Sequence, residues 1–280
     1  MQQRNLKMKN LLFTLLCLIL GQFVFSQEAA TKKVQAGLIV GSGLNFQEMK
    51  TDYFSTNGAG TDLSVGMNFN FNFTETIGFC TGLEFDFSNT RFQANDTIFY
   101  RFTDKEIIRK GDYDASKNYG ILQLDTRTDK SIYLSIPTML LFRTKFIGYF
   151  RYFGKFGLRN SFLLKTESFD RGNEYKSGSL TTDIPVITDK ANMTTKSNML
   201  FYKGAIGIAG GAEWNFSGST SLVGELGYYY GITPLYWERS ADSDKLSLFQ
   251  SGINNGTGND SYSPIKARQS QLMMKVSILF

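Results

Sequence analysis

The chain contains no histidine, and it has only two cysteines and four prolines among its 280 residues. Without histidine, a Ser-His-Asp triad, a His-ligated metal and imidazole acid–base catalysis are all excluded. Cys17 lies in the N-terminal apolar run described below, so Cys80 is the single cysteine of the rest of the chain. That remainder cannot form an internal disulfide, and we expect Cys80, in a strand flanked by glycines, to be a buried and inert thiol.

Motifs for nucleotides, metals or carboxylate catalysis are also missing. Gly41-Ser42-Gly43 is not followed by a helical pattern, as a phosphate-binding loop would be. Residues 254–260 are rich in side-chain oxygens but lack the Asp-x-Asp-x-Asp-Gly order of a calcium loop, so we interpret them as turn residues. Glu84 and Asp86 stand two positions apart, which is common in barrel strands, and a carboxylate hydrolase needs an open cleft. We predict a non-enzymatic protein with no catalytic residue, no cofactor and no metal.

Long apolar runs are scarce as well, and the one that stands out is residues 11–25. It follows the basic residues Arg4, Lys7 and Lys9 and ends in Val24-Phe25-Ser26, which suits cleavage before Gln27. The alternative is a single membrane helix, but such a helix needs about 20 apolar residues, and Gly21-Gln22 interrupts this shorter run. We predict that residues 1–26 are a signal peptide for export and that residues 27–280 form one domain.

The charge balance gives little support for nucleic-acid binding. The predicted leader holds three of the 30 basic residues and none of the 25 acidic ones, so the net charge falls from +5 to +2. No basic stripe with interleaved aromatic residues occurs, so we predict no nucleic-acid partner.

Residues 62–87 carry the most informative pattern of the chain. From Leu63 to Phe73, apolar side chains occupy every second position, and Asp, Ser, Gly and Asn occupy the positions between them. A turn at 74–76 separates this stretch from a second one with the same alternation. A period of two predicts strands with one apolar and one polar face. The strands are long and rich in aromatic residues, so we interpret the apolar face as facing lipid and the polar face as lining a barrel.

The same alternation recurs along the rest of the chain and predicts eight strands. They cover 34–46, 62–73, 77–87, 132–143, 152–165, 201–216, 220–231 and 268–280. Short connectors alternate with the long polar segments 47–60, 89–130, 166–198 and 233–265, although 97–102 and 121–125 alternate enough to extend the strands. We also expect Pro137 to cause a bulge or an end of regular pairing. The predicted fold is an all-β, eight-stranded antiparallel up-and-down transmembrane barrel with short periplasmic turns and long extracellular loops.

The parity of the strands also assigns the charged residues to the inside of the barrel. Four acids and four bases are predicted to face the lumen: Glu84, Asp86, Glu213, Glu225, Arg143, Lys155, Arg159 and Lys275. Eight strands leave room only for side chains, and buried charges persist only when they are paired. We predict a structural network of ion pairs, with a gated proton or solute path as the functional alternative. Outward-facing candidates for the aromatic girdles are Tyr152, Trp214, Tyr228 and Tyr230.

Several segments together resemble a known family. They are AGLIVGSGLNF, YLSIPTMLLFR with Ile136-Pro137, FGKFGLRNSFLL, GIAGGAEWNFSGSTSLVGELGYYYGITPL and QLMMKVSILF, which span most of the chain after residue 26. The sequence resembles the PorT-like outer-membrane β-barrel proteins of Bacteroidota. The resemblance implies an integral protein of the bacterial outer membrane, and the family namesake is associated with protein secretion and cell-surface export. A last strand that ends in an aromatic residue, here Phe280, resembles the signal read by the barrel assembly machinery.

The leading hypothesis is therefore a surface-exposed scaffold or a component of a secretion or envelope complex, with a filled and charged lumen. Its expected partners are outer-membrane lipid, the assembly machinery and that complex. Three alternatives remain at this point. They are a narrow pore or transporter, an enzyme with its site on the loop rim, and a soluble barrel that binds lipid inside.

Overall fold

The computed structural model describes residues 33–193, 198–237, 245–253 and 261–280. The predicted signal peptide and the turn at 254–260 lie outside the described residues. The elements, in chain order, are β1 (Val34–Met49), β2 (Phe54–Thr56), β3 (Gly60–Asn72), β4 (Ile77–Thr103), β5 (Glu106–Ile107), η1 (Lys110–Asp112), β6 (Gly120–Arg143), β7 (Phe150–Tyr175), β8 (Val186–Met193), β9 (Tyr202–Ser217), β10 (Thr220–Gly231), β11 (Gln250–Gly252), β12 (Ser261–Tyr262) and β13 (Ala267–Leu279). No helix among these residues is long and apolar enough to cross a membrane.

Eight of the strands close into a ring, which confirms the predicted fold. The order is β4-β3-β1-β13-β10-β9-β7-β6, and β6 pairs with β4 again. Each neighbouring pair is antiparallel. The first and last strands meet where the Ala36 amide donates to the Phe280 carbonyl at 3.3 Å and the Phe280 amide donates to the Ala36 carbonyl at 2.9 Å. Closure leaves no free edge in the ring, as a sheet in hydrocarbon requires.

Short turns lie at the end of the barrel where β1 begins and β13 ends. In the first turn, the Ile77 amide donates to the Thr74 hydroxyl at 2.9 Å, and the Phe73 amide donates to the Ile77 carbonyl at 3.0 Å. In the third turn, Gly218 adopts a φ of +45°, a left-handed conformation that favours glycine. Tight turns at one end and long connections at the other match the predicted arrangement of periplasmic turns and extracellular loops.

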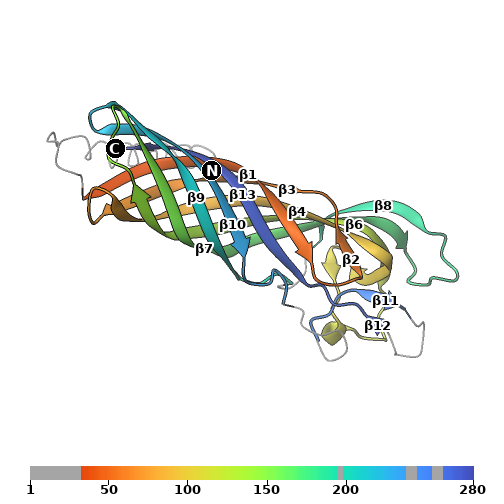
Figure 1. The fold of residues 1–280 in the computed structure, drawn as a ribbon. Helices are drawn as coiled ribbons and strands as arrows, with labels where there is room; N and C mark the ends of the chain where they lie inside the picture. Colours follow the sequence, from red (N-terminus) through yellow and green to blue (C-terminus); the bar gives the residue numbers. More distant parts are fainter. Residues whose placement is uncertain (1–32, 194–197, 238–244, 254–260) are drawn as a thin grey trace, which may run out of the picture.

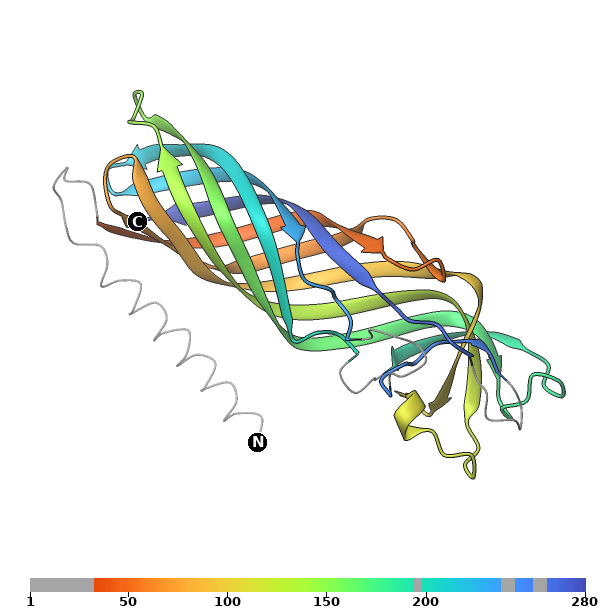
Figure 2. The ribbon, with the colours of Figure 1, turned by 60° about the horizontal axis from the view of Figure 1, so that its bottom comes forward.

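Three strands are far longer than a membrane requires. β4, β6 and β7 contain 27, 24 and 26 residues, whereas a membrane strand needs about 9–11. The prediction of loops at 89–130 and 166–198 was therefore wrong for most of their length, because these residues continue the wall of the barrel or pair with it through β8. The predicted extensions at 97–102 and 121–125 are confirmed. Figures 1 and 2 show this wall continuing beyond the ends of β1 and β3.

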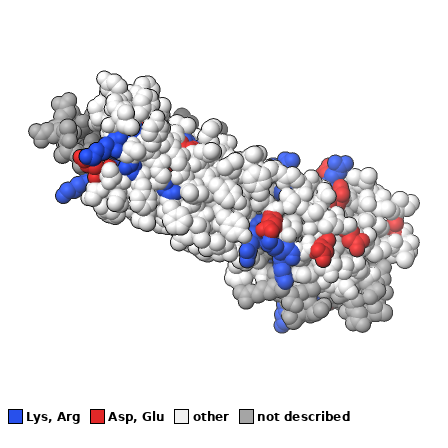
Figure 3. Space-filling model, viewed as in Figure 1, with Lys and Arg blue, Asp and Glu red and all other residues white. Residues whose placement is uncertain are grey.

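The barrel has two zones with opposite polarity. In the membrane zone, apolar side chains face outward and are exposed, including the predicted girdle residues Tyr152, Trp214, Tyr228 and Tyr230. In the extracellular zone, apolar side chains face inward and form a buried cluster. This aromatic cluster consists of Phe54, Phe92, Ile98, Tyr100, Phe102, Ile107, Leu122, Leu124, Tyr133, Met193, Met199, Leu235, Tyr236, Leu248, Phe249, Ile265 and Ala267. Figure 3 shows the exposed face of the membrane zone as a largely uncharged belt between charged ends.

Of the irregularities in the strands, two bear on the predictions. β4 and β6 keep one register from the pair Thr81–Thr138 to the pair Gln93–Thr126, and on this stretch the pairs at 136 and 137 are absent. The predicted bulge is therefore not found there, although pairing is interrupted, because proline lacks the amide donor. A bulge occurs instead in β7, where Ile132 pairs with Lys165 and Tyr133 pairs with Leu163. One extra residue moves all later side chains to the other face.

Candidate functional site

The eight charged residues assigned to the lumen from the sequence are all buried in the structure. They come from β4, β6, β7, β9, β10 and β13, so the network joins strands from around the ring. The structure divides them into a central group, a neighbouring pair and a group near the periplasmic end.

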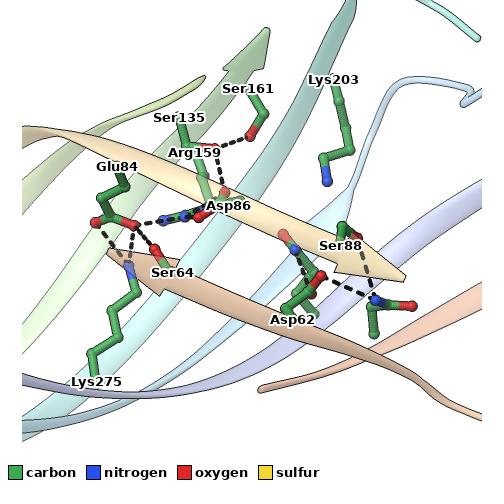
Figure 4. A network of polar contacts seen from close by, with 12 residues as sticks. Asp62, Ser64, Glu84, Asp86, Ser88, Ser135, Arg159, Ser161, Lys203 and Lys275 are labelled. Carbon is green, nitrogen blue, oxygen red and sulfur yellow. Dashed lines mark hydrogen bonds and ion pairs between the residues drawn. The ribbon is translucent and has the colours of Figure 1, made fainter. Parts of the chain in front are cut away.

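Arg159 is the centre of the network. Its Nη2 atom lies 2.6 Å from Glu84 Oε2 and 2.7 Å from Asp86 Oδ2. Lys275 Nζ donates to both oxygens of Glu84 at 2.9 Å. Glu84 and Asp86 project inward from the same strand because they are two residues apart, and Figure 4 shows Arg159 and Lys275 reaching them from other strands. The bases and acids are equal in number here, which satisfies the pairing that buried charges need.

Hydroxyl groups complete the coordination of the two carboxylates. Ser64 Oγ donates to Glu84 Oε2 at 3.1 Å, and Ser135 Oγ donates to Asp86. Ser161 Oγ lies 2.6 Å from Ser135 Oγ and extends this chain of contacts across the lumen. These serines come from β3, β6 and β7, where they occupy inward positions of the alternating pattern.

A second ion pair lies beside the central group. Lys155 donates to Glu225, and both side chains are buried. The ring of Tyr229 lies against the central group, with the guanidinium carbon of Arg159 at 5.3 Å and the Lys275 ammonium at 5.4 Å from its centroid. The aromatic face stabilises these buried cations.

At the periplasmic end, the base that pairs with Glu213 is one that the sequence prediction did not include. Glu213 is bound by Arg151, whose Nε and Nη2 atoms donate to its two oxygens at 2.7 and 2.8 Å. Arg143 instead donates to the side-chain oxygens of Gln35 at 3.0 Å and Asn72 at 2.5 Å. Arg151 was missed because the strand was predicted to begin at residue 152. Arg151 has the same parity as Lys155 and Arg159. Starting the strand one residue earlier would therefore have placed Arg151 inside.

Two further charged residues line the lumen toward the extracellular side. Asp62 accepts from Asn45 at 3.0 Å and from Gln271 at 2.7 Å. Lys203 donates to Gln269 Oε1 at 2.9 Å, and its ammonium lies 4.2 Å from the centroid of the Tyr133 ring. Both residues occupy inward positions of their strands, so parity identifies them although they were not predicted as members of the network.

The extracellular zone contains its own buried ion pair. Arg127 Nε and Nη2 donate to the two oxygens of Asp170, each at 2.6 Å, and Tyr100 donates to Asp170 at 2.7 Å. The guanidinium carbon also lies 4.9 Å from the centroid of the Phe249 ring. Burial and the Asp170 carboxylate raise the pKa of Tyr100 well above its usual value, so the hydroxyl remains a donor.

Asp129 forms a third polar contact within the aromatic cluster. Its oxygens accept from Ser168 at 2.6 Å and from Tyr236 at 2.9 Å. Burial raises the pKa of Asp129 even though Arg127 and the two hydroxyls oppose that change. The cluster and its paired polar groups therefore close the extracellular end of the lumen, while the charge network fills the membrane zone. An eight-stranded barrel of this kind has an interior only wide enough for side chains.

Comparisons with known proteins found weak likenesses to solved structures. No curated protein matches the sequence. Neisserial surface protein A is 10% identical, over 89% of this chain and 98% of that chain, with a TM-score of 0.32. OprG from Pseudomonas aeruginosa is 8% identical, over 88% and 95%, with a TM-score of 0.38. The outer membrane protease OmpT from Escherichia coli is 8% identical, over 91% and 98%, with a TM-score of 0.30. These likenesses concern the fold alone.

The sequence itself matches a family model over most of its length. Residues 25–236 match the model described as outer membrane protein beta-barrel domain. This match agrees with the closed ring, the outward apolar belt and the polar lumen. The chain therefore belongs to the outer membrane protein beta-barrel domain family and is an integral protein of the bacterial outer membrane.

Proposed function

We propose that this protein is a closed, non-enzymatic barrel that holds a rigid extracellular platform for a protein partner of the cell envelope. The observation that carries the proposal is the filled interior. Paired charges around Arg159 occupy the membrane zone, and the aromatic cluster occupies the extracellular zone. Both fillings place packed side chains across the lumen of an eight-stranded barrel, which disfavours the narrow pore or transporter.

The extracellular wall supports a role in binding. β7 and β8 form a hairpin beyond the membrane zone, which Figure 2 shows at the end of the molecule remote from the periplasmic turns. Ile184, Val186 and Ile187 on this hairpin are 86%, 51% and 72% exposed. Contiguous exposed apolar patches outside the membrane mark interaction sites, and these three residues lie within four positions of one another. The resemblance to PorT-like proteins favours a partner in a secretion or envelope complex.

Conductance measurements test the closed lumen. Wild-type protein inserted into planar bilayers should show no stable conductance steps. Reproducible steps from the wild-type barrel would contradict the proposal and favour the pore.

Photo-crosslinking in cells tests the platform. A photoreactive residue at Ile187 should give a discrete crosslinked protein, whereas the same residue at Lys165, which is exposed on β7 near the membrane rim, should not. Equal products at both positions would count against a specific surface. In a strain without the gene, the wild-type chain should restore the surface proteome, and a variant with residues 176–185 replaced by a short Gly-Ser turn should not.

Export and assembly belong to the same proposal. Residues 1–26 would be removed during export, which the N-terminal mass of the purified protein tests. The last residue, Phe280, would contribute to recognition by the assembly machinery. Phe280→Ala should then lower the amount of heat-modifiable barrel in the membrane without lowering synthesis, and an unchanged amount would contradict that role.

A further inference from the structure

A pocket of about 370 Å³ lies where β1 ends and β13 begins, and it is lined by exposed and half-buried residues together with two members of the aromatic cluster. Its lining combines three cations with apolar and aromatic side chains: Lys50, Lys266, Arg268, Leu200, Pro234, Tyr236, Trp237 and Ala267. The two strands bring the cations together, because the Lys50 amide donates to the Lys266 carbonyl at 2.7 Å and Glu48 pairs with Arg268 in the register.

The pocket lies directly above the face that contacts lipid. Arg268 is on the same face of β13 as Leu272 and Met274, which are 37% and 63% exposed. Arg268 and Leu272 are four positions apart, which corresponds to about 13 Å along a strand and about 10 Å along the membrane normal at the usual tilt. Arg268 therefore lies farther from the membrane centre than the lipid-facing Leu272 by about the thickness of the headgroup layer. Figure 3 shows Lys and Arg side chains gathered where the uncharged belt ends, over the ends of these strands.

The positive charge of the pocket is only partly compensated. Lys50 forms an ion pair with Glu48. Lys266 and Arg268 form no ion pair within the described part of the chain, and Arg268 is exposed. Among the residues that the structure describes, one acid therefore faces three cations, so the described lining has a net charge of +2. The apolar part of the lining, with Trp237 and Pro234, suits a sugar ring or the first carbons of an acyl chain.

We propose that this pocket binds the phosphorylated headgroup of a glycolipid in the outer leaflet. Lys266 and Arg268 bind the phosphate, Lys50 adds to the positive field, and Trp237 packs against the apolar part of the headgroup. A cationic site near the headgroups attracts anionic lipid, and each Lys or Arg raises the affinity about fivefold. The lipid belongs to the membrane in which the barrel lies, so the occupant is available at high local concentration.

Trp237 provides a direct reporter for this site. The chain has two tryptophans, and Trp214 stacks on Phe150 near the periplasmic turns. The full barrel with Trp214→Phe therefore reports on Trp237 alone. In detergent micelles, addition of diphosphorylated lipid A should shift its emission with saturation. Dephosphorylated lipid A should bind far more weakly, and inorganic phosphate at millimolar concentration should have no effect.

A matched pair of double variants separates a specific site from general charge. The double variant Lys266→Gln with Arg268→Gln should bind diphosphorylated lipid A roughly 30-fold more weakly, because each of the two lost cations contributes about fivefold to the affinity. Arg91→Gln with Lys130→Gln removes the same charge from exposed positions on β4 and β6 and should leave the affinity unchanged. Heat-modifiable mobility shows that each variant is folded. Equal affinities of the two double variants, equal binding of both forms of lipid A, or saturation by inorganic phosphate alone would overturn the proposal.

Discussion

Replacement of Arg159 by methionine is the sharpest test of the charge network. The Arg159 side chain is fully buried and contacts two carboxylates at 2.6 and 2.7 Å. Its removal leaves Lys275 as the cation in direct contact with Glu84, while Asp86 keeps only a hydroxyl partner. Breaking a buried pair from one side costs about 3–5 kcal/mol, because the remaining charge is uncompensated. We expect the free energy of unfolding of Arg159→Met to fall by that amount.

The control for this prediction is a double variant that restores the balance of buried charge without restoring the ion pair of Arg159 with Asp86. Arg159→Met combined with Asp86→Asn leaves Glu84 with Lys275, and the new amide oxygen still accepts from Ser135. We expect the double variant to recover about 2 kcal/mol, within the usual range of coupling energies between contacting residues. The assay is urea unfolding in lipid vesicles, followed by tryptophan fluorescence and heat-modifiable mobility. A loss below about 1 kcal/mol for the single variant, or no recovery in the double variant, would refute the argument.

Three other predictions concern the two zones. Phe69→Arg in β3 should lower the free energy of unfolding by about 2–4 kcal/mol if this outward residue lies near the midplane of the membrane. Phe73→Arg at the periplasmic rim should lower it by about 0–1 kcal/mol. Equal losses for the two variants in urea unfolding would argue against the lipid-facing assignment. Because burial raises the pKa of Asp129, its charged form destabilises the fold. Stability should rise as the pH falls through the folded pKa toward the usual value, and Asp129→Asn should remove this rise in pH-dependent unfolding. Phe249→Ala should open the aromatic cluster at a cost of about 3–5 kcal/mol and make the extracellular zone sensitive to protease; unchanged proteolysis would be incompatible with a packed cluster.

The alternation of side chains was sufficient to predict the membrane zone. From Leu63 to Phe87, a period of two identified the strands, their outward face and the inward position of Glu84. The rule works here because lipid and a filled lumen impose opposite polarities on the two faces of every strand. The same rule, applied one residue earlier in β7, would also have identified Arg151.

The extracellular zone was harder to predict for two physical reasons. Its polarity is reversed, with apolar residues inside, so residues such as Tyr100 and Leu122 did not match the membrane pattern around them. In addition, the bulge at 163–165 moves the later residues of β7 to the other face. Parity counted from Arg159 would therefore have placed Asp170 outside, although it lies inside and binds Arg127. A bulge has no reliable signature in a single sequence, and the ion pair joins segments 43 residues apart.

The reactivity of Cys80 tests the closed, inward-polar barrel most directly. This thiol is 3% exposed and lies on the inward face of β4. In vesicles, with Cys17→Ser to remove the other cysteine, we expect the folded barrel to react neither with a charged methanethiosulfonate nor with a membrane-soluble maleimide, and to react with both after unfolding. Rapid labelling of the folded barrel by the charged reagent would mean an open aqueous lumen. Labelling by the membrane-soluble reagent alone would mean that this face of β4 contacts lipid, and either result would contradict the account.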